Sequence, residues 1–427
     1  MVPPDRESRK SGSSKLQDSG SSNRTAASIS TRASSSTGPS ASRGSLASSA
    51  FMQRHGRTYL SDTTQPYPLP QDLPELHRQC LRTMLHIQLH GGPLCSLKPD
   101  APPPKRILEI GCGAGFWSTM CHRHFKSLGY PSVSFIGIDI APLESSMDGF
   151  RPDDDMQWTF IQMDAGAPPW PFPDEHFDVV FNKDMTLAIP LSRHPVFTEE
   201  SLRVLMPGGT LEIWETDHTI RMLRPHVPNP EAKGKQAKNI KMAAELGAYV
   251  VTMNTPLSVP LNPHLVEYNS WLSKALENKQ LMPNPCTVVN HYLYSESDSL
   301  EDVNSHRMAV PFSEIRWERD GMVGVITKDG KPYLESKALA EGRDVKRPAL
   351  TSAQAALRRT ALLTFVQEVQ AQELMLREIN GKKQDEWDAW IEKMISDLMN
   401  EGGTSWGECL EVGAWWAHKV KPGASTK

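Results

Sequence analysis

The chain has 427 residues, and its 46 Lys and Arg nearly balance 50 Asp and Glu, which leaves a net charge of −4. This balance excludes a uniformly basic surface, so nucleic acid is not an expected partner. The six cysteines include no Cys-x-x-Cys pair, and no apolar run reaches the length of a membrane span. We therefore expect neither a signal peptide nor a membrane span, and a reducing compartment, either the cytoplasm or the nucleus.

The first fifty residues are rich in Ser, and residues 1–57 hold nine Lys or Arg against three acidic residues. Such a segment buries too little apolar surface to offset its ordering entropy, so we predict a disordered tail over 1–53. A mitochondrial transit peptide is the competing interpretation of this composition, and Asp5 and Glu7 argue against it. Residues 54–104 then form a leading segment, in which a family resemblance, given below, implies a helix over 72–90.

Three glycines stand at alternate positions in the run Glu109-Ile110-Gly111-Cys112-Gly113-Ala114-Gly115, directly after the apolar residues Ile107 and Leu108. The pattern predicts a strand that ends in a glycine turn and opens a helix, whose N–H groups and dipole point at a ligand. A dinucleotide-binding loop needs a glycine where Phe116 stands. The acid-x-Gly-x-Gly-x-Gly spacing is instead typical of the S-adenosylmethionine loop of class I methyltransferases. The loop supplies the predicted cofactor-binding residues Glu109, Gly111, Cys112, Gly113 and Gly115.

Two further apolar runs end in an acid, residues 133–138 before Asp139 and residues 158–163 before Asp164. A carboxylate at the end of the second strand can accept hydrogen bonds from both ribose hydroxyls of an adenosine, which assigns this role to Asp139. In this fold class the acid after the third strand meets the adenine amino group, which assigns that role to Asp164. Each acid taken alone could instead be a helix cap or a solvated strand end. Three more residues complete the predicted cofactor site, namely Ile140, Ala165 and Asn182.

Strands and helical segments alternate along this part of the chain. Residues 177–182 predict a fourth strand, residues 202–209 close a helix with a proline and glycine stop, and residues 210–215 predict a fifth strand. The alternation predicts an α/β fold with ligands at the carboxyl ends of the strands. We predict the class I methyltransferase (Rossmann-like) architecture, a doubly wound seven-stranded sheet that is mostly parallel with an antiparallel last strand. Its cofactor-binding core occupies residues 105–220.

The chain departs from the minimal fold after the fifth strand. Helical spacing of apolar residues over 230–251 and 263–281 predicts a helical insertion at 221–300, placed over the acceptor site. Residues 302–311 and 408–418 predict the sixth and seventh strands. Residues 352–379 and 385–399 predict helices between them, so the last strands, within 301–420, are separated by an inserted helical hairpin.

Several segments resemble the fungal LaeA-like methyltransferases. The resemblance begins near residue 54, extends to the fifth strand near Glu215, and continues more weakly to the C-terminus. It is carried by Gly56-Arg57-Thr58-Tyr59, Tyr67-Pro68-Leu69-Pro70, Gly115-Phe116-Trp117 and Trp170-Pro171-Phe172-Pro173-Asp174. The resemblance implies S-adenosyl-L-methionine as the cofactor and a connection with secondary metabolism. Where relatives often carry a His-x-Arg pattern after the fourth strand, this chain has Asn182-Lys183-Asp184, so the resemblance assigns no catalytic residue.

Methyl transfer from a sulfonium requires acceptor, methyl carbon and sulfur in line, and needs a base only where the acceptor must lose a proton. Candidates for acceptor contact or proton removal lie after the fourth and fifth strands, and we choose Asp184 and His218. Alternatively, Lys183 and Asp184 form a capping or salt-bridged pair, and His218 packs as a loop histidine. No metal is expected, because the run Cys121-His122-Arg123-His124 cannot converge tetrahedrally on an ion without further ligands.

Together these features predict an S-adenosylmethionine-dependent methyltransferase whose acceptor is a small or mid-sized metabolite, or a protein. The alternative from the same resemblance is a nuclear regulatory protein that binds the cofactor and acts through a protein partner. A closed apolar acceptor pocket above the sulfonium favours a metabolite. A shallow site with an exposed apolar groove over 352–399 favours the regulatory partner.

Overall fold

The computed structural model of the chain describes residues 50–97, 102–142, 152–226, 232–319, 350–400 and 402–423. The predicted tail lies outside these residues except at its end, where β1 (Phe51–Arg54) begins. It pairs with β2 (Arg57–Leu60) as an antiparallel hairpin, and His55 and Gly56 in the turn have φ values of 47° and 73°. Positive φ at both central residues matches the twist of a two-residue hairpin. Residues 51–53 are therefore part of a strand and not of the tail.

The predicted leading helix is present as α1 (Leu73–His90). Asp72 caps its N-terminus, because its side chain accepts a hydrogen bond from the Glu75 backbone N–H at 3.2 Å. Gly91, with φ of 80°, ends the helix in the left-handed conformation that glycine adopts without a steric penalty. Asp72 also accepts two hydrogen bonds from the Arg57 guanidinium at 2.6 and 2.8 Å, which ties the hairpin to the start of the helix.

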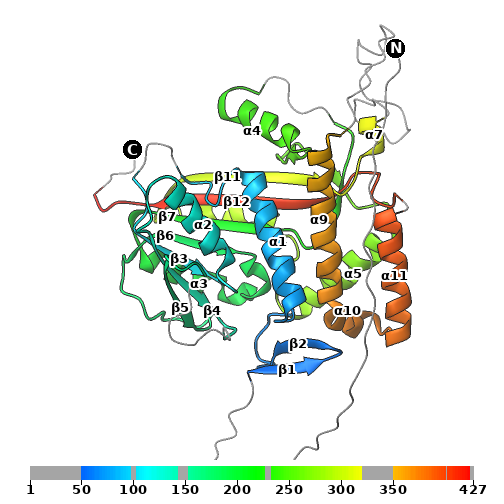
Figure 1. Cartoon of the computed structure of the whole chain (residues 1–427), viewed down its shortest axis with the longest axis horizontal. Helices are drawn as coiled ribbons and strands as arrows, with labels where there is room; N and C mark the ends of the chain where they lie inside the picture. The colour runs from blue at the N-terminus through cyan, green and yellow to red at the C-terminus, as the bar shows by residue number, and fades with distance from the viewer. Residues whose placement is uncertain are drawn as a thin grey trace, which may run out of the picture. The chain divides into compact units, whose positions relative to one another are not determined.

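Five parallel strands form the centre of the main sheet, in the order β5-β4-β3-β6-β7 (Figure 1). They are β3 (Arg106–Ile110), β4 (Ser134–Asp139), β5 (Gln157–Gln162), β6 (Phe177–Lys183) and β7 (Leu205–Thr216). The long strand β12 (Glu408–Lys419) lies between β7 and β11 (Leu300–Pro311) and pairs antiparallel with both. The seven predicted strands and their antiparallel last member are thus confirmed.

Three short strands that the sequence did not predict extend this sheet to ten strands. They are β8 (Arg221–Leu223), β9 (Tyr249–Val250) and β10 (Leu257–Ser258). They flank the antiparallel end of the sheet, where β8 pairs with β12 and β9 pairs with β11. Among the described residues, the parallel part of the sheet, which carries the glycine loop, contains only the predicted strands.

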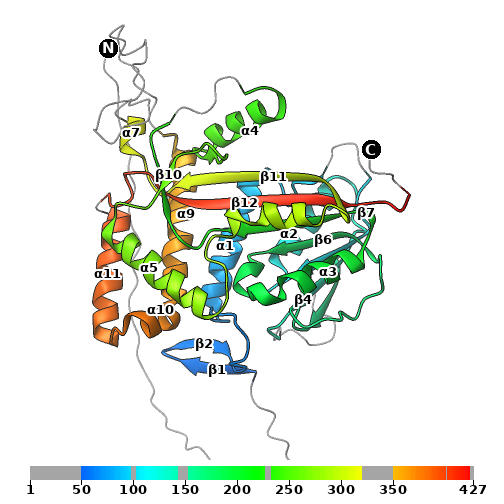
Figure 2. The ribbon, with the colours of Figure 1, turned by 180° about the vertical axis from the view of Figure 1, so that it is seen from behind.

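Helices cover both faces of the sheet, as a doubly wound fold requires. On one face, α2 (Phe116–Ser127) packs Trp117 against Phe181, with ring centroids 3.7 Å apart and planes within 3°. On the other face lie α3 (His194–Val204) and α6 (Val289–Ser295), which Figure 2 shows from behind. The helix before the fifth strand ends at Val204, so the predicted stop over 202–209 lies mostly within β7.

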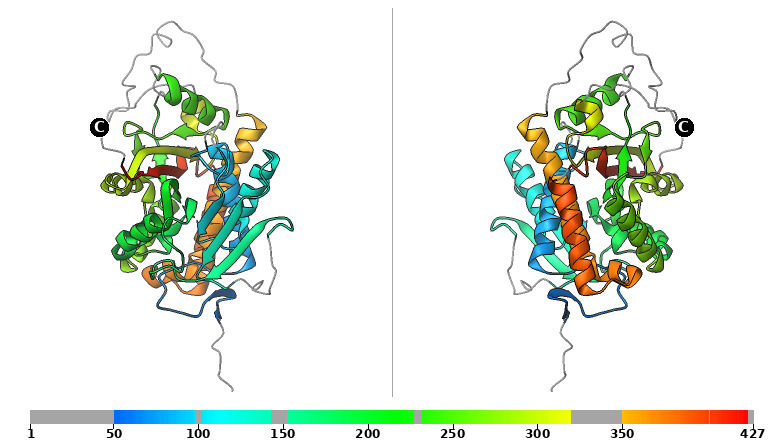
Figure 3. Two further views of the ribbon diagram at one scale, coloured as in Figure 1. Left: turned by 90° about the vertical axis from the view of Figure 1, so that its left-hand side faces the viewer. Right: turned by 90° about the vertical axis from the view of Figure 1, so that its right-hand side faces the viewer.

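A second apolar core forms where the late helices pack beside α1. These helices are α5 (Pro263–Asn278), α9 (Ser352–Ala371), α10 (Glu373–Asn380) and α11 (Gln384–Asn400). Buried Leu89, Leu272, Phe365 and Trp387 belong to one cluster of this core. Figure 1 shows α9 and α11 on the side of the molecule away from the parallel strands, and the right-hand view of Figure 3 looks onto that side. The remaining helices are α4 (Gly234–Glu245) and the single turn α7 (Arg316–Arg319).

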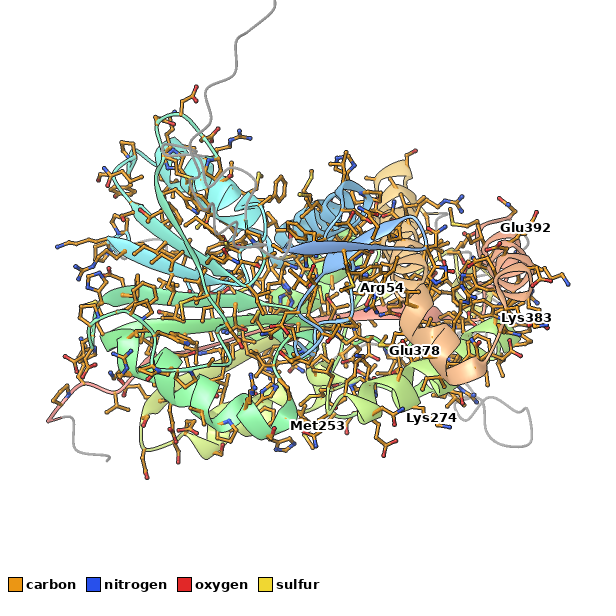
Figure 4. The ribbon with its side chains drawn as sticks, turned by 90° about the horizontal axis from the view of Figure 1, so that it is seen from below. Arg54, Met253, Lys274, Glu378, Lys383 and Glu392 are labelled. Carbon is orange, nitrogen blue, oxygen red and sulfur yellow. The ribbon has the colours of Figure 1, made fainter. Side chains whose placement is uncertain are left out.

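The predicted helix over 352–379 is divided in two at Gln372. The Gln372 side chain accepts a hydrogen bond from the Tyr268 hydroxyl at 3.0 Å and donates to Glu368 at 3.3 Å. These contacts hold the junction of α9 and α10 against α5. Figure 4 looks at the molecule from below and labels Lys274 on α5, Glu378 on α10 and Arg54 on the hairpin.

Candidate functional site

The glycine loop between β3 and α2 requires glycine at its alternate positions. Gly111, Gly113 and Gly115 have φ values of 69°, 50° and 70°, in the left-handed region. A Cβ atom on Gly111 would lie 2.5 Å from Sδ of Met185, and one on Gly115 would lie 3.1 Å from the Trp158 ring. The backbone can therefore follow this path only without side chains. As predicted from the spacing, the turn leaves Cys112 and Gly113 at the wall of a pocket.

Asp139, at the end of β4, binds the backbone of the glycine loop. One carboxylate oxygen accepts a hydrogen bond from the Gly113 N–H at 2.8 Å, and the other accepts from the Ala141 N–H at 2.9 Å. Burial raises the pKa of Asp139, while these backbone N–H groups act in the opposite direction. Each oxygen of a carboxylate can accept more than one hydrogen bond, so Asp139 keeps acceptor capacity for a ligand's hydroxyl groups.

Asp164 lies after β5, at the more open side of the same pocket. Its Oδ1 accepts a hydrogen bond from the Gly166 N–H at 2.8 Å, which orients the carboxylate. Its other oxygen lies 3.4 Å from a guanidinium nitrogen of Arg193, and its side chain is 25% exposed. The two residues that follow the strand-end acids, Ile140 and Ala165, also line the pocket. This arrangement brings a polar edge and apolar walls together, as a nucleoside base requires.

Glu109 is the buried acid at the end of β3. Its Oε2 accepts hydrogen bonds from the Ser118 hydroxyl at 2.5 Å and from the Ser118 N–H at 3.3 Å. Burial raises the pKa of Glu109 to about 8, so the carboxyl group holds its proton at neutral pH. Glu109 therefore links the strand to the first turn of α2 while also lining the pocket.

A pocket joins this loop to the ends of β6 and β7. It encloses about 1210 Å³ including its open mouth. Of the twelve predicted site residues, ten line it, namely Glu109, Gly111, Cys112, Gly113, Asp139, Ile140, Asp164, Ala165, Asp184 and His218. Gly115 and Asn182 do not. Gly115 shapes the turn, and Asn182 is 2% exposed within β6, whose next and last residue, Lys183, lines the pocket instead.

Asp184 lies at the acceptor side of the pocket, directly after β6. Its Oδ2 accepts a hydrogen bond from Lys183 Nζ at 2.6 Å, while its buried Oδ1 has no partner among the described residues. Burial would raise the pKa of Asp184, but the Lys183 ammonium and other nearby cations hold it below its usual range. The salt-bridged pair considered from the sequence is therefore present, and it faces the pocket.

His218, two residues after β7, is 3% exposed and belongs to a buried polar network. Its Nδ1 lies 3.0 Å from Oε1 of Glu368 on α9. The second oxygen of Glu368 accepts a hydrogen bond from Arg82 of α1 at 2.7 Å, and Arg78 lies 3.6 Å from it. Burial would raise the pKa of Glu368, but these arginines and His218 lower it. The network links two helices that are distant in sequence.

Sequence reasoning missed the side chains that α1 and the segment before it contribute to the pocket. Tyr67 and Gln79 face one another, with the Gln79 amide donating to the Tyr67 hydroxyl at 3.1 Å. Burial raises the pKa of Tyr67 well above its ordinary value. Tyr67 belongs to a segment that carries the family resemblance, and nothing in its spacing indicates a wall of the site. Arg78, Arg82, Met185 and Glu368 were missed for the same reason.

Two further observations concern the described residues as a set. They contain no group of three or more His, Cys, Asp or Glu side chains that could hold a metal ion. None of their helices is long and apolar enough to cross a membrane.

The fold and the site define a class I methyltransferase domain. Residues 107–209, from the first parallel strand to the fifth, match the family described as "Methyltransferase domain". The glycine turn, the Asp139 carboxylate and the partly open Asp164 edge fit the methionine, ribose and adenine parts of S-adenosylmethionine. These residues would hold the cofactor, which supplies an electrophilic methyl group on a sulfonium.

Named relatives agree with this class. The chain is similar to the fatty-acid O-methyltransferase of Mycolicibacterium smegmatis, with 35% identity over 107 residues that cover 25% of this chain and 35% of that protein. It is also similar to the secondary metabolism regulator laeA of Aspergillus niger, with 27% identity over 168 residues that cover 39% of this chain and 41% of that protein. The chain thus carries a methyltransferase domain with LaeA-like sequence, and it spans about two fifths or less of these relatives.

Among solved structures, the Haemonchus contortus phosphoethanolamine N-methyltransferase 2 in complex with phosphomonomethylethanolamine and S-adenosylhomocysteine shares 12% identity. The matched region covers 80% of this chain and 53% of that chain, with a TM-score of 0.35.

Proposed function

We propose that this protein transfers the methyl group of S-adenosylmethionine to a small or mid-sized metabolite. The observation that carries the proposal is the continuity of the pocket. The same space is lined by Gly111 and Asp139 at one end and by Asp184 and His218 at the other. A donor held at the first end therefore presents its methyl group toward polar side chains that can contact an acceptor.

The covering of the pocket supports a metabolite acceptor over a protein segment. Tyr67 and Leu69 from the leading segment, Arg82 from α1 and Glu368 from α9 all border the space. The acceptor end is thus bordered by elements from several parts of the chain, which suits a compact acceptor better than an extended protein segment. The similarity to an enzyme named for fatty-acid O-methylation is in keeping with a compact, partly apolar acceptor.

A regulatory role through a protein partner is the second candidate, supported by the similarity to the secondary metabolism regulators laeA. It requires an apolar docking surface on the late helices. Within 352–399, all of which the structure describes, no large apolar side chain is exposed. Trp387, Trp390 and Leu398 instead point into the core. The geometry therefore favours the metabolite reaction.

The experiment that tests the proposal is calorimetric titration of S-adenosylmethionine into the full chain and into Asp139→Ala. We expect micromolar binding by the wild type and at least about tenfold weaker binding by the variant. Glu212→Gln is the matched control, because Glu212 also accepts two backbone N–H bonds, from Cys95 and Ser96, yet lies outside the pocket. Its affinity should equal that of the wild type.

A labelled-methyl assay then separates the candidate functions. Fatty acids, long-chain alcohols and hydroquinones serve as acceptor probes beside short peptides. Label in a small-molecule fraction supports the proposal. Binding of the donor with no transfer to any probe favours the regulatory candidate, and no donor binding by folded wild type contradicts both.

A further inference from the structure

We infer that His218 is the proton-accepting group of the acceptor site, positioned by Glu368, and that the acceptor is a hydroxyl group, an alcohol or a phenol. The inference rests on the proposed function and names its acceptor class. It depends on three features of the structure: the tethering of His218, the ionisation of Glu368, and the unpartnered ring nitrogen of His218.

His218 is fixed at three points. Its backbone N–H donates to the carbonyl of Pro283 at 2.9 Å, and its own carbonyl accepts from the Tyr268 hydroxyl at 3.1 Å. Its ring nitrogen Nδ1 is 3.0 Å from Glu368 Oε1. A ring held at both backbone groups and at one nitrogen has its remaining nitrogen in a fixed direction, which is what a base acting on a bound substrate needs.

Glu368 determines which nitrogen carries the proton. Arg82 donates to its other oxygen at 2.7 Å, and Arg78 is 3.6 Å away, so the carboxyl group stays ionised. An ionised carboxylate can only accept hydrogen bonds, so Nδ1 of His218 must be the protonated nitrogen. In the neutral form of this ring, Nε2 then carries the lone pair.

The second ring nitrogen of His218, Nε2, is buried and has no hydrogen-bond partner within the described part of the protein. His218 and Glu368 both line the pocket that contains Gly111 and Asp139. A buried acceptor atom without a donor is costly, and a hydroxyl group of a bound substrate would satisfy it.

The charged and titratable groups around His218 come from each element packed against it. They are Glu368 from α9, Arg78 and Arg82 from α1, and Tyr268 from α5. The two arginines share Glu368 with the histidine, and Arg78 is also paired with Glu75 at 2.6 Å. The two arginines are thus shared between Glu75 and Glu368, and Glu368 is the charged group in direct contact with His218.

The chemistry accounts for every atom. As the hydroxyl oxygen forms its bond to the methyl carbon, the carbon–sulfur bond breaks and its electron pair stays on sulfur. The hydroxyl proton passes to Nε2 of His218, and Glu368 stabilises the resulting imidazolium through Nδ1–H. A hydroxyl group needs this assistance because its pKa lies well above neutrality, whereas a carboxylic acid is already ionised.

The first test observes the histidine directly and needs no acceptor. Full-length protein labelled with ¹⁵N-histidine is studied by long-range ¹H–¹⁵N correlation, with His218→Gln identifying the signals. We expect Nδ1–H and a bare Nε2 in the wild type, and loss of this tautomer preference in Glu368→Gln. A wild-type spectrum with the proton on Nε2 would overturn the inference, even if the Glu368 variant failed to fold.

The second test measures transfer of labelled methyl to long-chain alcohols and phenols and to fatty acids of equal length. His218→Gln should lose at least about a hundredfold in hydroxyl methylation, and any transfer to carboxylates should change little. Equal losses on both acceptor classes would overturn the inference. Should no probe accept a methyl group, the tautomer measurement alone decides.

The matched control is His122→Gln. His122 is equally buried and its Nε2 lies 3.2 Å from a carboxylate oxygen of Asp155, but it lies on α2 outside the pocket. This variant should keep wild-type transfer. Calorimetry with S-adenosylmethionine separates the two proposals, because both histidine variants should bind the donor normally. Loss of donor binding in the wild type itself would instead contradict the proposed function.

Discussion

The two ends of the pocket are built in different ways. The donor end takes its residues from a short stretch, Glu109 to Ala165, and from the ends of three adjacent parallel strands. The acceptor end combines residues from distant parts of the chain. Tyr67 and Arg82 precede the first strand of the main sheet in sequence, whereas His218 and Glu368 follow the fifth parallel strand. Local sequence therefore defines the first end, and long-range packing defines the second.

The same difference appears in the polar contacts. At the donor end, Asp139 and Asp164 bind mainly backbone N–H groups, which any sequence with this fold presents. At the acceptor end, Glu368 binds side chains from two other elements, and its bond to Arg82 joins residues 286 positions apart. A backbone-built site stays constant while its neighbours change. A site built from side chains can change its ligand by substitution, so under the proposed function we expect the acceptor end to determine specificity.

The largest expected effect is on the acceptor end, where Glu368→Ala leaves Arg78 and Arg82 buried without their shared partner. We expect a loss of about 3–5 kcal/mol in the free energy of unfolding, measured with urea. Glu373→Ala is the control, because Glu373 forms a partly exposed pair with Arg377 on the adjacent helix, and it should cost about 0–1 kcal/mol. Equal costs for the two variants would show that the network does not stabilise the fold.

The donor end should respond next most strongly, to Gly111→Ala. The new Cβ combines left-handed strain of about 1–2 kcal/mol with a clash against Met185, and overpacking adds about 1–3 kcal/mol. Gly129→Ala is the matched control, because Gly129 has φ of +89° and open space around its Cβ position. It should carry the strain alone.

Calorimetry and thermal unfolding together check this result. Gly111→Ala should lose donor affinity, whereas Gly129→Ala should keep it. Measured in a Met185→Ala background, Gly111→Ala should cost only the left-handed strain, because the clashing sulfur is absent. If Gly111→Ala bound the donor as tightly as the wild type, the backbone path would not define this end.

The parallel strands could be predicted from the sequence, because each consists of an apolar run that is followed by turn residues. The positions of Asp139 and Asp164 followed too, since a strand's carboxyl end fixes where its next residue lies. Asn182 shows the limit of that rule, because β6 continues to Lys183 and leaves Asn182 inside the sheet. A difference of one residue reverses the side-chain direction in a strand.

The acceptor end was largely beyond prediction for a physical reason. His218 was selected because it follows a strand, but its partner Glu368 lies in a helix whose position depends on packing against α1. Residues 221–300 were expected above the acceptor site, yet none of those described lines the pocket, and α1 and α9 supply that wall. The break at Gln372 is also set by tertiary contacts, with Tyr268 and Glu368.

A pH dependence of intermediate size is expected from Glu109 at the donor end. Its pKa is about 8 in the fold against 4.5 as its ordinary value. Folded protein holds this proton while unfolded chain loses it, so the contribution of Glu109 to stability is complete below pH 4.5 and is lost as pH rises to about 8. Glu109→Gln removes the titration, so its stability relative to the wild type should rise by about 2 kcal/mol from pH 5.5 to 7.5.

Urea unfolding at several pH values measures this difference. Asp178→Asn is a suitable control, since Asp178 accepts backbone N–H bonds from Lys105 and Arg106 near the start of the same strand but is only partly buried. Its relative stability should be flat over the same range. A flat difference for Glu109→Gln would mean that Glu109 is already ionised in the fold.

The smallest effect is expected at the contact between the hairpin and the start of α1. The segment that contains Tyr67 lies between these two elements. Asp72→Ala removes the N-cap of α1 and the two hydrogen bonds from Arg57, and should cost about 1–2 kcal/mol. Arg57→Ala keeps the cap and should cost less, about 0.2–1 kcal/mol, because the pair is partly exposed. Hydrogen exchange should quicken over 61–71 in Asp72→Ala and stay unchanged over β3 to β5. Faster exchange in the parallel strands would contradict the separation of the two ends, since it would mean that the donor end relies on the leading segment as much as the acceptor end does.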